Sequence, residues 1–104
     1  MSGNGIGQAG SFESNDLMVT VDLSSKYNSG LDLSIESSVK DQFGAQIEKT
    51  VKAVLEEYGV TDGKIELVDK GALDFTIRAR VKTALSRAGV EANNQSSEGG
   101  SNLE

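Results

Sequence analysis

The sequence feature that most constrains the fold is a stretch of about twenty residues in which apolar side chains recur at helical spacing. These side chains form one stripe, which consists of Val39, Phe43, Ile47, Val51, Val54, Leu55 and Tyr58. Ser38, with Asp41 three residues further on, provides an N-cap signature, and Gly59 is a natural residue to follow a helix end. The pattern predicts an amphipathic helix over residues 38–58, roughly 30 Å long. Such a helix is long enough to cover one face of a small sheet.

Short stretches of alternating apolar and polar residues flank this helix and predict β-strands. Residues 17–23 and 31–36 alternate in this way, and the short connection between them predicts an antiparallel hairpin. Residues 64–69 predict a third strand with Ile65 and Leu67 pointing inward. Residues 73–81 fit both periods, and we interpret them as a strand over 72–78 followed by a helix over 79–88. The predicted order is β-β-α-β-β-α, an α+β two-layer sandwich with a small, mainly antiparallel sheet and two helices on one face.

The length and composition predict one small domain between two polar segments. Residues 1–10 are glycine-rich and predict a flexible segment, residues 11–88 form the domain, and residues 89–104 predict a disordered tail. The stretch from Gly5 to Gly10 matches the G-x-G-x-x-G pattern of dinucleotide sites. That fingerprint requires a strand before it and a helix after it, whereas an alternating stretch follows here. We therefore reject a dinucleotide site.

Two residue types that perform most protein chemistry are absent from this chain. It contains no His and no Cys, so it lacks the commonest general base, a thiol nucleophile and thiolate metal ligands. The net charge of −6 disfavours nucleic acid as a partner. No apolar run approaches eighteen residues and no signal-peptide pattern is present, so we expect a cytoplasmic protein. We therefore do not expect a chain of this composition to be an enzyme on its own.

The side chains that remain as candidates are loop hydroxyls and a basic group. Ser11 and Ser14 lie in a polar loop that ends at the first predicted strand, a position that suits a residue modified by another enzyme. The composition of the loop is equally compatible with two ordinary, unmodified loop serines. The basic group lies in the second half of the chain and comprises Lys70, Arg78, Arg80, Lys82 and Arg87. It could be a solvated face, or a docking surface for an acidic partner or for the phosphates of a tethered group.

Three blocks of sequence resemble, in the same order, the acyl carrier (gamma) subunit of citrate lyase. They are residues 9–19 (Ala-Gly-Ser-Phe-Glu-Ser-Asn-Asp-Leu-Met-Val), residues 37–44 (Ser-Ser-Val-Lys-Asp-Gln-Phe-Gly), and residues 69–74 (Asp-Lys-Gly-Ala-Leu-Asp) with Ile-Arg-Ala-Arg at 77–80. The resemblance spans roughly residues 9–88. Phe12, Asn15 and Phe75 depart from the residues usual in that family, but none of them removes a hydroxyl.

The resemblance implies that Ser14, in the Glu-Ser-x-Asp stretch, carries a phosphoribosyl-dephospho-coenzyme A group through a phosphodiester. It also implies three partners: a prosthetic-group transferase, an alpha subunit that exchanges acetyl for citryl on the arm, and a beta subunit that cleaves citryl to oxaloacetate. The carrier itself would supply no catalytic side chain and no metal ligand.

Two other functions stay open at this point. The carrier subunit of malonate decarboxylase uses the same prosthetic group, although the Gln-Phe-Gly block favours citrate lyase. A non-catalytic interaction domain with an unmodified Ser14 is the other alternative. Phosphopantetheine carriers fit less well, because they are helical bundles with an Asp-Ser-Leu motif that this sequence lacks.

Overall fold

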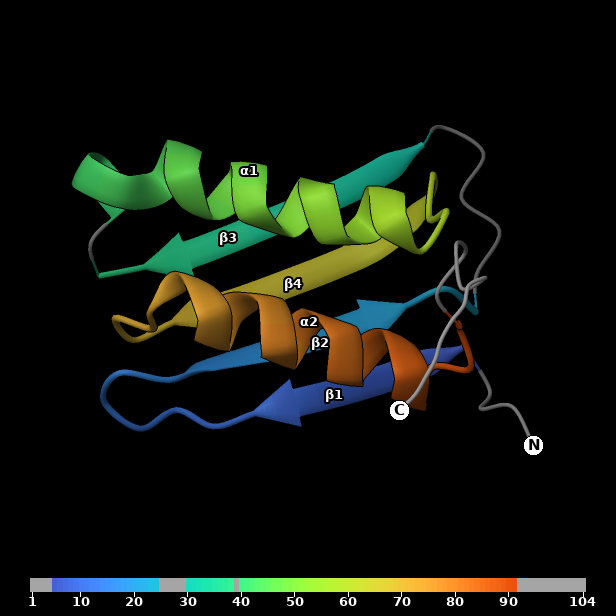
Figure 1. Cartoon of the computed structure of the whole chain (residues 1–104), viewed down its shortest axis with the longest axis horizontal. Helices are drawn as coiled ribbons and strands as arrows, with labels where there is room; N and C mark the ends of the chain where they lie inside the picture. Colours follow the sequence, from blue (N-terminus) through green and yellow to red (C-terminus); the bar gives the residue numbers. More distant parts are fainter. Residues whose placement is uncertain (1–4, 25–29, 39, 92–104) are drawn as a thin grey trace, which may run out of the picture.

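The computed structural model describes residues 5–24, 30–38 and 40–91, which form a four-stranded sheet with two helices on one face (Figure 1). The elements are β1 (Ile6–Gly10), β2 (Leu17–Asp22), β3 (Leu31–Ser37), α1 (Lys40–Glu57), β4 (Gly63–Asp69) and α2 (Asp74–Arg87). The strand order in the sheet is β1-β2-β4-β3. The pairs β1/β2 and β2/β4 are antiparallel and β3/β4 is parallel. The predicted α+β two-layer sandwich is therefore confirmed.

The order of the elements along the chain differs from the prediction at both ends. It is β-β-β-α-β-α, because residues predicted to be flexible form β1 and residues predicted to be a strand begin α2. The strand predicted over 72–78 is wrong because Leu73 and Phe75 are exposed, whereas Ile77 and Val81 are buried one helical turn apart. The predicted flexibility is wrong for Ile6–Gly10, which pairs along its length with β2. Residues 1–4 lie outside the described part.

The hairpin predicted between residues 17–23 and 31–36 does not form, because β4 lies between β2 and β3. The two strands run in opposite directions, as predicted, but neither pairs with the other. One strand position therefore separates β2 from β3. The position is filled by β4, which returns beside β3 after α1 in a parallel β-α-β unit.

The predicted long helix is confirmed as α1, with bounds within two residues of the prediction. Most of its stripe is buried, including Ile47, Val51, Val54 and Leu55. Phe43 is an exception, because 51% of its surface is exposed. Val39 lies outside the described residues.

The core lies between the helices and the inner face of the sheet. Cross-strand rows such as Ala9, Val19 and Leu67 place small and branched side chains under the helices. Gly7 lies beneath α2, and a Cβ there would be 2.0 Å from the backbone oxygen of Ala84. Within the described residues, no helix is long and apolar enough to cross a membrane.

Candidate functional site

Two loops lie side by side at one end of the sheet, on the left in Figure 1, and one of them contains Ser14. We call residues 11–16 and 70–73, with the first turns of α1 and α2, the loop end. The N–H of Asn15 donates to the carbonyl of Lys70 at 2.8 Å, and the N–H of Lys70 donates to the carbonyl of Asp16 at 2.9 Å. These bonds continue the antiparallel pairing of β2 and β4 beyond its last pair, Leu17 with Asp69. The base of the Ser14 loop is therefore attached to the sheet.

Ser14 lies at the tip of a tight turn. The N–H of Asp16 donates to the carbonyl of Glu13 at 3.2 Å, which places Ser14 and Asn15 in the middle of the turn. Asn15 has a φ of 66°, a left-handed conformation that asparagine tolerates better than most residues. The Ser14 side chain is exposed, and no described residue is hydrogen-bonded to its hydroxyl. The hydroxyl is thus presented to solvent from a defined backbone position.

The carboxylate of Asp16 anchors this loop to α2. Nε and Nη2 of Arg80 donate to Oδ1 and Oδ2 of Asp16 at 2.9 and 3.0 Å, a bidentate pair. Oγ of Ser11 donates to Oδ2 at 2.7 Å, and the N–H of Leu17 donates to Oδ1 at 2.7 Å. The hydrogen bonds from Arg80 and then from Ser11 lower the pKa of Asp16 from 3.8 to about 2. The group is therefore ionised at all physiological pH values.

The two candidate serines consequently differ in availability. The Ser11 hydroxyl donates to Asp16 and accepts the N–H of Glu13 at 3.3 Å, so it is part of the loop's internal structure. Ser14 has no such role among the described residues. Of the two hydroxyls, Ser14 is the one that can be modified without disrupting the anchor.

The neighbouring loop of the loop end is organised by a buried carboxylate, that of Asp69, which is 2% exposed. It accepts the hydroxyl of Ser37 at 2.8 Å and the N–H groups of Gly71 and Ala72 at 3.2 and 3.0 Å. These bonds close the turn that leads from β4 into α2. Sequence reasoning missed this role because alternation alone marks Asp69 only as the end of a strand.

The basic group predicted from the sequence does not form one uncommitted face. Arg80 binds Asp16, Arg78 pairs with Asp74 at 3.0 Å, and Arg87 donates to the carbonyl of Gln8 at 2.8 Å. Each of these arginines therefore has an internal partner, and Lys70 and Lys82 are exposed. The hypothesis that Arg78 and Arg80 face a partner stays a prediction, and their geometry is explained without one.

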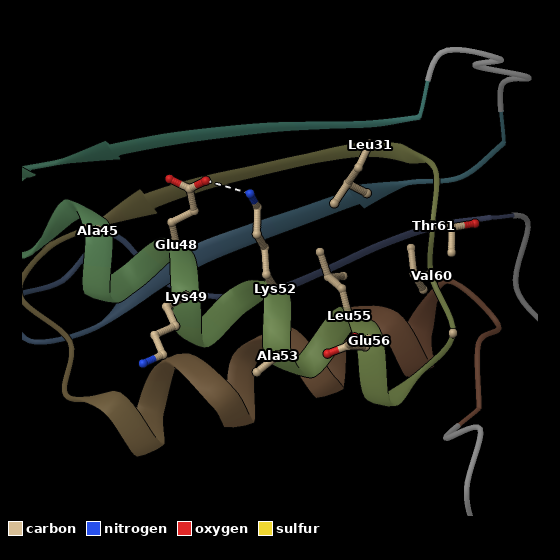
Figure 2. Close-up of a pocket in the computed structure, with 11 residues that line it drawn as sticks. Leu31, Ala45, Glu48, Lys49, Lys52, Ala53, Leu55, Glu56, Val60 and Thr61 are labelled. Atoms are coloured by element: carbon tan, nitrogen blue, oxygen red, sulfur yellow. Dashed lines mark ion pairs between the residues drawn. The ribbon is translucent and has the colours of Figure 1, made fainter.

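Two hollows lie in the surface of the described residues. A depression of about 780 Å³ lies along α1, where Leu31 and Leu55 point toward one another and an ion pair joins Glu48 and Lys52 at 2.8 Å (Figure 2). Apart from Ala45, its lining residues lie outside the loop end. A smaller hollow of about 360 Å³, which we call the loop-end hollow, lies between the first turns of α1 and α2. Among the described residues, no cluster of acidic side chains could hold a metal ion.

Comparisons with known proteins agree with this geometry. A family model described as the malonate decarboxylase delta subunit matches residues 5–88, so the match includes β1. The citrate lyase acyl carrier proteins of Treponema denticola and Streptococcus mutans are 52% and 51% identical to this chain. These alignments cover 76% and 77% of this chain and 86% and 76% of the relatives.

A solved structure shows the same fold. A chain of a Pseudomonas malonate decarboxylase hetero-tetramer, crystallised in complex with malonate, superposes with a TM-score of 0.70 at 19% identity. The match covers 86% of this chain and 89% of that one. At this identity the likeness establishes only the fold, whereas the sequence relatives establish the family. The chain therefore belongs to the citrate lyase acyl carrier protein family, and it also matches the family model described as the malonate decarboxylase delta subunit.

Proposed function

We propose that this chain is the acyl carrier subunit of citrate lyase and that the Ser14 hydroxyl carries its prosthetic group. The group would be phosphoribosyl-dephospho-coenzyme A, joined to Oγ of Ser14 through a phosphodiester. Its terminal thiol would hold acetyl or citryl as a thioester. The carrier relatives at 52% and 51% identity support the role of the chain.

The observation that carries the assignment of Ser14 is its position at the tip of an anchored turn. A transferase must bring a large phosphorylated group to the hydroxyl, which requires an exposed side chain without competing hydrogen bonds. Ser14 meets this requirement, whereas Ser11 is bonded to Asp16. The Glu-Ser-x-Asp stretch therefore serves two purposes, since its Asp16 holds the loop and its Ser14 accepts the group.

The anchoring also suits an arm that visits more than one active site. A tethered thioester reaches a high effective concentration at each site, provided that the tether begins at a defined point. The pair of Asp16 with Arg80 and the bonds to Lys70 supply that point. Because the sequence contains no His or Cys, we propose that all bond-making is performed by the partners. These would be the transferase and the alpha and beta subunits, acting with the carrier in the cytoplasm.

The carrier of malonate decarboxylase is the second candidate, and the family model points to it. The sequence relatives favour citrate lyase, because a 52% identity over most of the chain contrasts with 19% to the malonate decarboxylase chain. Reconstitution distinguishes the two. We expect the loaded carrier to restore citrate cleavage to citrate lyase alpha and beta subunits.

Intact mass spectrometry tests the attachment site directly. The chain is co-produced with the prosthetic-group transferase and its precursor-forming enzyme, as wild type, Ser14→Ala and Ser11→Ala. We expect one coenzyme-derived adduct on the wild type and on Ser11→Ala at the end point, and none on Ser14→Ala. An adduct that persists on Ser14→Ala would move the site, and a wild type that stays unmodified beside a loaded positive-control carrier would overturn the carrier function.

A further inference from the structure

The loop end exposes an unusual amount of apolar surface for so small and polar a protein. Phe12, Phe43, Leu73 and Phe75 expose 60%, 51%, 60% and 69% of their surfaces. Within residues 5–24, 30–38 and 40–91, Ile6 at 46% is the only other large apolar side chain that is exposed to this degree. Exposed apolar side chains that gather in one region are typical of interaction surfaces, whereas scattered ones are not.

These four side chains all belong to the loop end, which also contains Ser14. Phe12 lies in the Ser14 loop, and Leu73 and Phe75 lie where the neighbouring loop passes into α2. Phe43 lies in the first turns of α1, and with Leu73 it lines the loop-end hollow. Figure 1 shows both loops and the starts of both helices at the same end of the molecule.

We propose that these four side chains form the surface through which the carrier docks on the alpha and beta subunits of the lyase. The proposal rests on the proposed function. An arm attached to Ser14 can enter an active site only if the carrier surface around Ser14 meets the protein surface around the entrance of that site. Three of the four are phenylalanines, and aromatic side chains are enriched at the cores of protein interfaces.

The arm itself is a poorer occupant of this surface. The loop-end hollow is also lined by Asp69 and by Asp74, whose side chain is 49% exposed. The arm carries phosphates and citryl adds carboxylates, whereas the lining of this hollow contains no Lys or Arg to pair with them; Arg78, the partner of Asp74, lies outside the lining. A second copy of the chain is a poorer occupant too, because pairing through the loop end would cover Ser14. A partner protein with an apolar rim fits the surface and leaves Ser14 pointing into its active site.

Binding measurements on the carrier test the proposal. Phe75→Ser and the triple variant Phe12→Ser/Leu73→Ser/Phe75→Ser are compared with wild type by biolayer interferometry on immobilised alpha and beta subunits. All three are used in the unloaded form, so that the arm contributes nothing to the affinity. Ile6→Ser is the matched control, since it removes an exposed apolar side chain at the opposite end of β1. Circular dichroism and thermal unfolding verify that each variant is folded.

We expect Phe75→Ser to weaken binding about tenfold and the triple variant about a hundredfold, while Ile6→Ser stays within about twofold of wild type. Unchanged affinity in the triple variant, or no binding by wild type, would overturn the docking surface. A wild-type dimer in sedimentation that the triple variant abolishes would instead identify a second copy as the occupant, and the proposal would be wrong. Because the adduct on Ser14 is measured separately by mass, the docking surface can fail while the carrier function stands.

Discussion

Replacing Arg80 by methionine should loosen the loop that presents Ser14, by an amount that the structure allows us to bound. Arg80 supplies two of the hydrogen bonds that hold Asp16, and their removal leaves the carboxylate, which is only 16% exposed, with Ser11 and the N–H of Leu17. The pKa of Asp16 falls from 3.8 to about 2 in the folded protein. Each pKa unit corresponds to about 1.4 kcal/mol, so the net effect of its partners and its burial stabilises the ionised group by about 2.5 kcal/mol. Arg80 is itself 40% exposed and screened by solvent, so we expect Arg80→Met to remove only part of this stabilisation.

The sign of the pH dependence follows from the lowered pKa. A carboxylate whose pKa is depressed by folding contributes stability above its unfolded pKa and loses it as pH falls through the folded pKa. The contribution of Asp16 is therefore complete at neutral pH, declines below pH 3.8 and is lost near pH 2. The difference between wild type and Arg80→Met should stay constant from pH 7 to pH 5 and shrink below pH 4.

Urea unfolding at pH 7, 5, 4 and 3 measures this difference, with Arg78→Met as the control. Arg78 lies on the same helix and pairs with Asp74, but both side chains are more than 40% exposed, so its loss should cost at most about 0.5 kcal/mol. In native-state hydrogen exchange, the Asn15 N–H should exchange faster in Arg80→Met than in Arg78→Met. Equal costs for the two variants, or an Arg80→Met deficit that persists undiminished at pH 3, would refute the assignment of Arg80 as the anchor.

Two further substitutions test the packing that supports the site. Gly7→Ala should destabilise the fold by about 1–3 kcal/mol, because its Cβ would lie 2.0 Å from the backbone oxygen of Ala84 and α2 must shift away from β1. Thermal unfolding measures this loss of stability. A variant with an unchanged Tm would contradict the close contact between Gly7 and α2. Asp69→Ala should cost about 2–3 kcal/mol in urea unfolding, since it leaves two loop amides and the Ser37 hydroxyl without their acceptor. Asp32→Ala, on the exposed side of β3, is its control and should stay within about 0.5 kcal/mol of wild type.

Elements whose burial pattern has one clear period were predicted well. The apolar stripe of α1 and the alternation in β2 and β4 can each be recognised within one short stretch of sequence. The structure places Val51, Val19 and Leu67 in the core as expected. The apolar residues of 73–81 fit both the two-residue period of a strand and the 3.6-residue period of a helix, so only packing could decide between these structures. The helix prevailed because Ile77 and Val81 are buried together, which leaves Leu73 and Phe75 exposed.

The carrier family could be inferred from the sequence, because the Glu-Ser-x-Asp stretch and the blocks that follow it are local strings of residues. Ser14 could be proposed from the same strings. The exposure that distinguishes it from Ser11 could not, because it depends on where the Asp16 side chain points and which groups reach it.

By itself the sequence determined the local periods, the absence of His and Cys, and the position of the candidate serine. Tertiary structure decided the insertion of β4 between β2 and β3, the recruitment of a glycine-rich segment as β1, and the pair between Asp16 and Arg80, 64 residues apart. Strand order and long-range ion pairs arise from how the elements pack, and packing brings together residues whose separation along the chain carries no periodic signal. The contacts that hold the Ser14 loop in place, such as the pair of Asp16 with Arg80, are therefore decided by the tertiary structure.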